Sequence, residues 1–300
     1  CMTGGWVGYA AYDTVRYAEP TKLPFELAPA DDRGLPDMHF GFYDGVVVFD
    51  HAESTVLVIR LALVGRGDDP MEKYERAVRD IQRTVGMLQS QTRVFPAGFV
   101  DDLPADDDVS ARVRSNTTRE AHRAMVERAR SYIASGDAFQ IVLGQRFEMR
   151  ERADPFDVYR ALRAINPSPY MTYLQAPGAI LVASSPEILC RVRRDSAGGP
   201  WVVTNRPLAG TRRRGRDESE DSALERELLA DHKECAEHAM LVDLGRNDVG
   251  RVARPSSVAL PAVMEIERYS HVMHITSNVT GELREGLTPW DALRSALPVG

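Results

Sequence analysis

The segment Lys233-Glu-Cys-Ala-Glu-His-Ala-Met-Leu-Val-Asp-Leu-Gly-Arg-Asn-Asp248 has the pattern of an amphipathic helix. Its apolar residues recur at helical spacing: Ala236, Met240, Leu241 and Leu244. Glu234 and Glu237 are three residues apart, so they lie on neighbouring turns of one face. Hard divalent cations such as Mg²⁺ take carboxylate oxygen ligands. An exposed helix with a Lys233–Glu237 ion pair explains the same spacing, so the pattern alone leaves both interpretations open.

The composition is that of an ordinary globular protein. Of 300 residues, 43% are hydrophobic and 27% are charged, which suits one large domain or two smaller ones. The net charge of −7 offers no basic surface for nucleic acid. No apolar run approaches membrane-spanning length, and no signal peptide is visible. Neither nucleic acid nor a membrane is therefore an expected partner.

The cysteines indicate a reducing compartment. Cys1, Cys190 and Cys235 are odd in number and far apart in the sequence. A disulfide framework needs cysteines in pairs, so we expect these thiols to be reduced. The expected location is therefore the cytoplasm.

Two regions are expected along the chain. Residues 1–110 form the remainder of an N-terminal region, with a helix at 70–88. An acidic, proline-containing linker at 101–108 closes this region, because it has too little apolar content to order itself. Residues 117–300 form the second region.

The second region alternates short strands with helices. Its first helix is expected to begin at the N-cap Thr117, with Glu120 completing a capping box, and to end at Gly136. Strand-like runs follow at 139–149, 170–175, 179–184, 187–193, 201–204, 262–269 and 271–280. Further helices are expected at 155–165 and 220–246. Short strands that arrive in pairs predict an α+β fold with large, mostly antiparallel sheets packed with helices.

Two segments between these elements are expected to be loops. Arg206-Pro-Leu-Ala-Gly-Thr211 is rich in small residues and follows a strand. Arg212-Arg-Arg-Gly-Arg216 is strongly basic and is followed by balancing acids: Asp217, Glu218, Glu220 and Asp221. The balance of charge predicts a solvated loop.

Both ends of the sequence look cut. The chain opens with Cys1 rather than Met, and it stops at Leu297-Pro-Val-Gly300 at the exit of a helix. That helix has a strong start, with Thr288 as N-cap, Pro289 in the first turn and Asp291 three residues past the cap. We therefore expect a piece of a longer protein whose fold is incomplete at the C-terminus.

Several motifs occur in order along residues 117–300: Gly136-Asp-Ala-Phe-Gln-Ile-Val-Leu-Gly-Gln-Arg-Phe147, Asn166-Pro-Ser-Pro-Tyr-Met171, Ser184-Ser-Pro-Glu-Ile-Leu189, Arg206-Pro-Leu-Ala-Gly-Thr-Arg212, the acidic helix, and Ile266-Glu-Arg-Tyr-Ser-His-Val-Met-His-Ile275. In this order they resemble the motifs of the chorismate-utilising enzymes, most closely anthranilate synthase component I. The resemblance implies the fold of that family and a lyase that converts chorismate and ammonia to anthranilate and pyruvate in tryptophan biosynthesis. It also implies Mg²⁺ as cofactor, a glutamine amidotransferase subunit or fused domain that supplies the ammonia, and tryptophan as inhibitor.

The resemblance assigns catalytic and metal-binding roles. It makes Glu187 the acid that protonates the departing C4 hydroxyl of chorismate, a role that needs a carboxyl group kept neutral near pH 7. It places His274 near the C1 carboxylate, where it helps the later steps. Glu237 becomes the magnesium ligand, and Glu234 contacts the ion through water. Without the resemblance, Glu187 would be an ordinary edge-strand acid and His274 a packed strand histidine.

Four further positions would line the substrate pocket: Gln140, Ala209, Gly210 and Thr211. Water-adding relatives carry a lysine as general base at the position of Gln140, and an amide cannot abstract a proton from water. Aminodeoxychorismate synthases carry a nucleophilic lysine at the position of Ala209, and alanine cannot attack C2 of the ring. Gly210 and Thr211 would contact a substrate carboxylate through backbone N–H and hydroxyl groups. The lysines of both rival chemistries are therefore absent.

The segment Asn166-Pro-Ser-Pro-Tyr-Met171 has two interpretations. Two prolines fix its backbone, so it is explained as a rigid turn into a strand. The resemblance makes it half of a tryptophan feedback site, with Pro169, Tyr170 and Met171 as the contacting residues.

Two alternatives to anthranilate synthesis stay open. One is aminodeoxychorismate synthase component I or another aminating chorismate enzyme, which product analysis would separate. The other is a non-catalytic module that pairs with an amidotransferase or binds tryptophan. The family carries further substrate contacts and a second magnesium-binding glutamate beyond the position of Gly300, so this segment alone is expected to be inactive.

Overall fold

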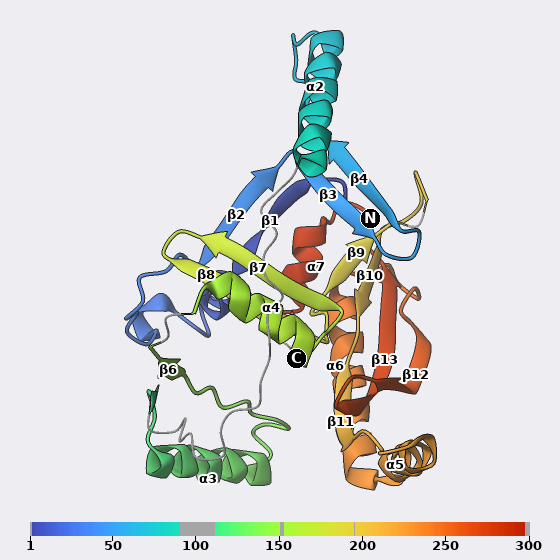
Figure 1. The fold of residues 1–300 in the computed structure, drawn as a ribbon. Helices are drawn as coiled ribbons and strands as arrows, with labels where there is room; N and C mark the ends of the chain where they lie inside the picture. Colours follow the sequence, from blue (N-terminus) through green and yellow to red (C-terminus); the bar gives the residue numbers. More distant parts are fainter. Residues whose placement is uncertain (1, 91–111, 151–152, 195, 298–300) are drawn as a thin grey trace. The chain divides into compact units, whose positions relative to one another are not determined.

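The computed structural model describes residues 2–90, 112–150, 153–194 and 196–297 (Figure 1). The chain forms two compact units, Cys1–Ala97 together with Leu162–Gly300, and Gly98–Ala161. The predicted linker at 101–108 lies outside the described residues. The predicted division into 1–110 and 117–300 therefore stays a prediction.

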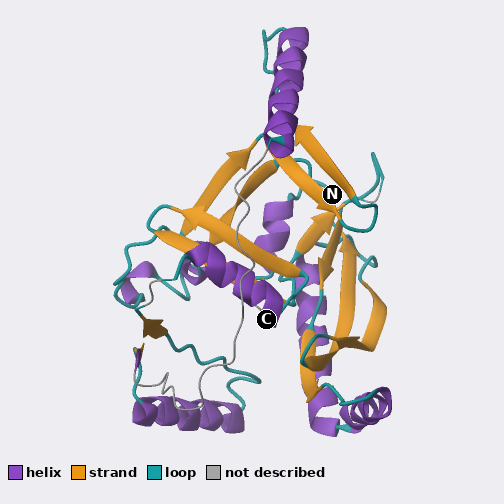
Figure 2. Ribbon diagram, in the orientation of Figure 1, coloured by secondary structure: helices purple, strands orange, loops and turns teal. Residues whose placement is uncertain are grey.

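Helices and strands are mixed along the chain, and the described strand pairs are antiparallel (Figure 2). This confirms the predicted α+β fold with antiparallel sheets. One described sheet has five strands, and the others are two-stranded. None of the helices in the described ranges is long and apolar enough to cross a membrane.

The five-stranded sheet carries most of the predicted site. Its strands are β9 Arg191–Arg193, β10 Val202–Asn205, β11 Leu208–Arg213, β12 Ala259–Arg268 and β13 Val272–Glu282. β13 is the longest, and it pairs with β10, β11 and β12. The predicted strands at 201–204, 262–269 and 271–280 are confirmed. Of the predicted strand at 187–193, only the last three residues pair, since Pro186 and the residues after it form the turn that leads into β9.

Two helices pack on this sheet, α5 Glu218–Ala230 and α6 His232–Val252. The prediction of one helix over 220–246 is therefore wrong. Asp231 leaves the helical conformation, with ψ of 103°, and its side chain accepts hydrogen bonds from the backbone N–H groups of Lys233 and Glu234. A capping aspartate thus begins a new helix where the sequence shows neither glycine nor proline.

The buried face of α6 also differs from the predicted stripe. Ala236 is exposed, and the buried residues of the helix are His238, Val242, Gly245, Asp248, Val249 and Val252. The buried face includes two polar residues and one glycine: His238, Asp248 and Gly245. A prediction from the spacing of apolar residues cannot include them. Val203, Val242, Val249 and Val279 form one core cluster between helix and sheet, and Leu228, Met273 and Ile275 form a second.

The arginine-rich segment is only partly the predicted solvated loop: Arg216 is exposed and lies outside any strand, but the segment begins in a strand and is held by ion pairs. Arg212 and Arg213 belong to β11, and arginines of the segment pair with acids of α5. Arg212 also donates from Nε to Glu227 Oε1 at 2.7 Å and from Nη2 to Asp231 Oδ2 at 2.8 Å. Of the four acids expected to balance the charge, Glu220 and Asp221 form ion pairs with these arginines, and the bonds order the segment.

The remaining elements of the larger unit are β1 Gly5–Ala10, the 3-10 helix Tyr12–Thr14, α1 Val15–Ala18, the 3-10 helix Phe25–Leu27, β2 Met38–Tyr43, β3 Gly45–Asp50, β4 Thr55–Arg60, α2 Pro70–Gln89, β7 Tyr170–Ala176, β8 Ala179–Ser185 and α7 Pro289–Ser295. The predicted helix at 70–88 and the strand pair at 170–184 are confirmed. The capping box of α7 is confirmed as well, because the backbone N–H of Thr288 donates to Asp291 Oδ2 at 2.7 Å.

The smaller unit contains β5 Val113–Ser115, α3 Arg119–Ser135 and β6 Phe147–Met149, and α4 Pro155–Ile165 begins within it. The N-cap of α3 is Thr118 rather than the predicted Thr117, because Thr118 Oγ1 accepts the N–H of Ala121. Its predicted end at Gly136 is confirmed, in the left-handed conformation that glycine favours. The predicted strand at 139–149 is wrong except for its last three residues, since β5 pairs only with β6.

Candidate active site

Of the segment predicted to be a loop at 206–211, only Arg206 and Pro207 lie outside a strand, and the rest begins β11. Ala209 pairs with Ile275 of β13 and Thr211 pairs with His274, so Gly210 is the extra residue of a β-bulge. Gly210 has φ of +76°, and a Cβ there would lie 3.0 Å from Ile275 Cδ1. The left-handed conformation therefore favours glycine here, and a Cβ would also crowd the Ile275 side chain.

The bulge brings three predicted residues together. Thr211 Oγ1 lies 3.0 Å from His274 Nδ1, and the same nitrogen lies 3.1 Å from the carbonyl oxygen of Gly210. On the other side of β13, His274 pairs with Glu267 of β12. Residues directly opposite in antiparallel strands share a face, so Thr211, His274 and Glu267 form a polar row across three strands.

Glu267 connects this row to two residues that the sequence analysis did not single out. Arg206 forms an ion pair with the Glu267 carboxylate, and Tyr269 donates from its hydroxyl to Glu267 Oε2 at 2.7 Å. The Tyr269 ring meets the His274 ring edge to face, with centroids 5.7 Å apart. All three residues lie inside the quoted motifs, so the motifs were the available signal for them.

Glu187 lies in the turn after β8 rather than in the predicted strand at 187–193, and its carboxylate faces the start of β11. Its Oε1 accepts the backbone N–H of Leu208 at 3.2 Å. Glu187 is exposed as a whole residue, but burial of its carboxyl group raises its pKa, against the opposing effects of the Leu208 bond and the Arg206 charge. This is the direction that a general acid requires.

The charges of Glu187 and Arg206 also affect Tyr269. Burial raises the pKa of its phenol most, and the charges of Glu187 and Tyr170 raise it further, while Arg206 lowers it. Glu187, Arg206, Tyr269 and the polar row therefore form one cluster. The cluster combines a carboxyl group of raised pKa, a guanidinium and an imidazole. The carboxyl group can donate a proton, and the guanidinium can bind an anion.

The segment 166–171, which the resemblance assigns to tryptophan binding, is hydrogen-bonded to Ser184. Ser184 Oγ donates to the Asn166 carbonyl oxygen at 2.8 Å and lies 2.8 Å from Ser168 Oγ. Tyr170 and Met171 then begin β7, paired with Ser185 and Ser184 of β8. The rigid turn into a strand is confirmed, and a role in tryptophan binding stays a prediction.

Two predicted pocket residues are placed differently. Ala209 pairs with the fully buried Ile275 and is itself 9% exposed, so it shares the helix-covered face rather than the face of His274. Gln140 lies in the irregular segment before β6, in the smaller unit. Its position relative to Glu187 is therefore not described, and both roles stay predictions.

The predicted metal-binding acids, Glu234 and Glu237, both lie on α6. Lys233 Nζ lies 2.9 Å from Glu234 Oε1 and 3.7 Å from Glu237 Oε2, so the two carboxylates converge on one positive charge. The Lys233–Glu237 ion pair predicted from spacing is thus confirmed. Across the described ranges, no group of three or more acidic, histidine or cysteine side chains is arranged for a metal. Both carboxylates are already paired with Lys233, so the predicted magnesium site stays a prediction.

The chain is similar to known proteins along nearly its whole length. Residues 2–300 match the sequence profile of a family described as chorismate binding enzyme. The chain is 55% identical over 298 residues to anthranilate synthase alpha subunit 1, chloroplastic, of Oryza sativa subsp. indica, covering 99% of this chain and 50% of that protein. It is 44% identical over 300 residues to anthranilate synthase component 1 of Acetivibrio thermocellus, covering 100% of this chain and 58% of that protein.

A solved structure agrees with the sequence matches. The crystal structure of anthranilate synthase component I from Streptococcus pneumoniae superposes with a TM-score of 0.79 at 36% identity, covering 99% of this chain and 61% of that one. The chain thus spans about half the length of the rice protein and somewhat more of the bacterial ones. The match extends through the first 110 residues, which the motifs alone did not reach.

Proposed function

The chain belongs to the chorismate binding enzyme family, and from this premise we propose that the full-length protein is an anthranilate synthase component I. It converts chorismate and ammonia to anthranilate and pyruvate, in tryptophan biosynthesis. The names of its relatives, from plant and bacterial sources, support this choice within the family. The chain spans about half of the rice relative, so the proposal concerns the whole protein.

The observation that carries the proposal is the place of Glu187 beside the start of β11, where its Oε1 accepts the Leu208 N–H at 3.2 Å and burial raises the pKa of its carboxyl group. Amination at C2 of chorismate expels the C4 hydroxyl, and that hydroxyl leaves as water only if it receives a proton. A carboxyl group that stays protonated above its usual range supplies this proton. Burial raises the pKa of Glu187, and the bond from Leu208 N–H fixes the orientation of the carboxyl group.

The polar row and Arg206 serve the anionic substrate. Chorismate carries two carboxylates, and the Arg206 guanidinium supplies positive charge beside Glu187. The Thr211 hydroxyl and the His274 ring lie on the same face as Glu267. We assign Thr211 and Gly210 to carboxylate binding and His274 to the C1 end of the ring, where it assists the later loss of the C2 proton.

We assign Mg²⁺ to Glu237, with Glu234 bound through water, as the resemblance to the family implies; the ion would displace the Lys233 ammonium, which both carboxylates now contact. The ion, when bound, supplies positive charge for the C1 carboxylate of the substrate. A glutamine amidotransferase, as subunit or fused domain, supplies ammonia. Tryptophan inhibits the enzyme through Pro169, Tyr170 and Met171.

Product analysis of the full-length protein tests the proposal. Incubation with chorismate, an ammonium salt and Mg²⁺ is expected to yield anthranilate and pyruvate in equal amounts. The Glu187→Gln variant, which cannot donate a proton, should be slower by about 10²–10⁴-fold. Its control is Glu285→Gln, an exposed acid outside the cluster, which should be unaffected.

Each other product identifies another function. Aminodeoxychorismate without pyruvate would indicate aminodeoxychorismate synthesis, which the lack of a lysine at Ala209 argues against. Isochorismate would indicate water addition, which the amide of Gln140 argues against. No turnover by the full-length protein would favour a non-catalytic module.

A further inference from the structure

The turn between β12 and β13 carries Tyr269 of the candidate active site. Hydrogen bonds from Arg214, a residue outside the cluster, hold this turn in place. Arg214 follows directly after β11. Its backbone N–H donates to the His271 carbonyl oxygen at 3.0 Å, and its side-chain Nη1 donates to the Tyr269 carbonyl oxygen at 2.6 Å. Arg214 therefore binds two carbonyl groups of one turn, which fixes that turn relative to β11.

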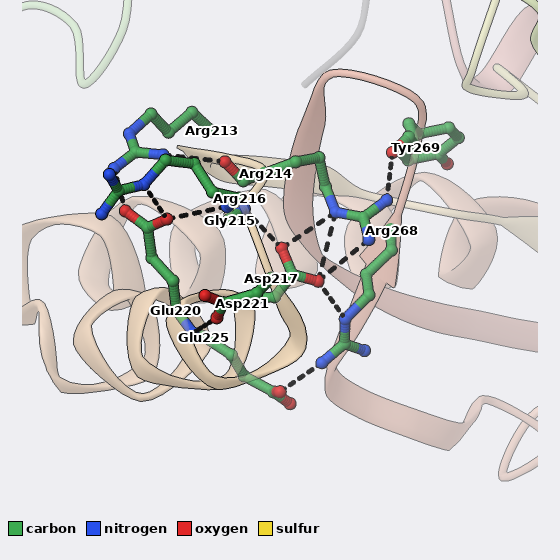
Figure 3. Close-up of polar contacts among 10 residues, drawn as sticks. All are labelled: Arg213, Arg214, Gly215, Arg216, Asp217, Glu220, Asp221, Glu225, Arg268 and Tyr269. Atoms are coloured by element: carbon green, nitrogen blue, oxygen red, sulfur yellow. Dashed lines mark hydrogen bonds and ion pairs between the residues drawn. The ribbon is translucent and has the colours of Figure 1, made fainter.

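Asp221 of α5 orients the Arg214 guanidinium (Figure 3). Arg214 donates from Nε to Asp221 Oδ1 at 3.0 Å and from Nη2 to Oδ2 at 2.9 Å, a two-pronged contact. Asp221 also accepts the Gly215 N–H at 2.7 Å and Arg268 Nε at 3.2 Å. Its side chain is only 10% exposed, and these bonds lower its pKa to about 2.

The turn in its place sets the geometry of the cluster. The hydroxyl of Tyr269 donates to Glu267, and its ring lies against His274. The carbonyl of Tyr269, at the other end of the residue, is the atom that Arg214 holds. A shift of this carbonyl moves the ring, and with it the groups that the ring contacts.

We propose that Asp221 is a positioning residue of the candidate active site. Asp221 orients Arg214, and Arg214 fixes the turn at Tyr269. The position of this turn then fixes the Tyr269 side chain against Glu267 and His274. Asp221 lies on the opposite face of the sheet from the polar row. Its partner Arg268 stands between Glu267 and Tyr269 in the sequence, and successive residues of a strand point to opposite faces. The catalytic consequence rests on the function proposed above, whereas the positional one does not.

Glu220 provides a matched control on the same helix. It is adjacent to Asp221, its pKa is also lowered to about 2, and it binds the neighbouring arginines Arg213 and Arg216. The contacts of Glu220 do not include the turn at Tyr269: they join α5 only to the arginine segment (Figure 3). A role in general stability predicts that both acids matter alike, whereas positioning predicts that only Asp221 affects the site.

The experiment compares Asp221→Asn, Arg214→Lys and Glu220→Gln in the full-length protein. Lysine keeps the charge of Arg214 but cannot bind Asp221 with two prongs and Tyr269 at once. Tyr269 is followed by ¹⁹F NMR after incorporation of 3-fluorotyrosine, with the signal assigned by Tyr269→Phe. Anthranilate formation gives kcat and KM separately, and thermal unfolding gives Tm.

Asp221→Asn and Arg214→Lys are expected to shift or broaden the Tyr269 signal and to lower kcat by about 10–100-fold, because misplacement by about 1 Å can cost this much. Glu220→Gln should leave the signal in place and change kcat less than about threefold, within the effect of a surface pair. An unshifted signal in Asp221→Asn, or equal losses in Asp221→Asn and Glu220→Gln, would overturn the inference. If the wild type makes no anthranilate, the proposed function fails, and the Tyr269 signal still decides the positioning.

Discussion

Thr211 and His274 face each other across the β11–β13 pair, with Thr211 Oγ1 3.0 Å from His274 Nδ1. The bulge at Gly210 produces this contact, and it also directs the Gly210 carbonyl oxygen to the same nitrogen at 3.1 Å. A carbonyl can only accept a hydrogen bond, so His274 Nδ1 carries a proton and donates. In the neutral ring, the lone pair is then on Nε2, which is the nitrogen that would accept a proton in the function proposed above.

The first prediction concerns this tautomer. The ¹⁵N NMR signals of neutral His274 are expected to show Nδ1 protonated in the wild type and in Thr211→Val, because the Gly210 carbonyl remains in both. Loss of the hydroxyl should lower kcat/KM about fivefold, the equivalent of one hydrogen bond of ~1 kcal/mol. A ring protonated at Nε2 in either protein would contradict the assignment of Nε2 as the basic atom.

The second prediction concerns Glu187 and pH. The pKa of Glu187 is higher in the folded state than in the unfolded state, so the folded state binds more protons. The contribution of Glu187 to the free energy of unfolding is therefore largest below the unfolded pKa and is lost as pH rises through the folded pKa. Glu187→Gln removes this penalty. The variant should therefore be more stable than the wild type at pH 7, and the difference should shrink towards pH 4.

Urea unfolding at pH 4 and pH 7 measures this difference. Glu285→Gln, at an exposed site, serves as the control for loss of a carboxylate. A wild type that gains stability over Glu187→Gln as pH rises would mean that the Leu208 and Arg206 contacts outweigh burial, and Glu187 would then be a poor proton donor.

The third prediction concerns the acids of α6. Lys233 lies nearer to Glu234 than to Glu237, at 2.9 Å against 3.7 Å, so Glu237 is the carboxylate with more freedom to bind a cation. Glu237→Gln should weaken Mn²⁺ or Mg²⁺ binding by more than about 100-fold, and Glu234→Gln by about 10-fold, as for a residue that acts through water. Electron paramagnetic resonance with Mn²⁺ measures binding without relying on activity. Equal, small effects of both variants would contradict the ligand assignment.

Local signals explain which elements the sequence predicted well. Helix α2, helix α4 and the start of α7 have apolar periodicity together with a proline at the first turn. The strands β7 and β8 show the pattern of a tight pair, with Gly178 between them at φ of +78°. Each of these signals lies within a few residues of the element that it predicts.

Long-range contacts explain what the sequence did not predict. The bulge at Gly210 arises from pairing with Ile275 and His274, more than sixty residues away, so the segment looked like a loop. The ion pair of Arg206 with Glu267 is equally distant in sequence. Conversely, the alternating run from 139 to 146 suggested a strand, but alternation produces one only when a partner strand is present. The catalytic roles came from motif resemblance, because a lone acid or histidine has no distinguishing pattern.

The last prediction concerns Ala209. Its methyl group lies on the buried side of β11, opposite Ile275, so Ala209→Lys adds a long side chain to a packed position and should lower stability by about 1–3 kcal/mol. The lysine stem is flexible enough to carry its ammonium out of a buried backbone position. If residue 209 borders the chorismate pocket, the amine attacks C2 as the C4 hydroxyl leaves as water, and mass spectrometry of the full-length variant with chorismate and Mg²⁺ should detect the substrate mass less one water on Lys at 209. Ala262→Lys, on β12 of the same sheet and outside the polar row, tests the effect of an added lysine and should stay unmodified. Unchanged anthranilate production without an adduct at 209 would place Ala209 outside the pocket, in agreement with its pairing to Ile275.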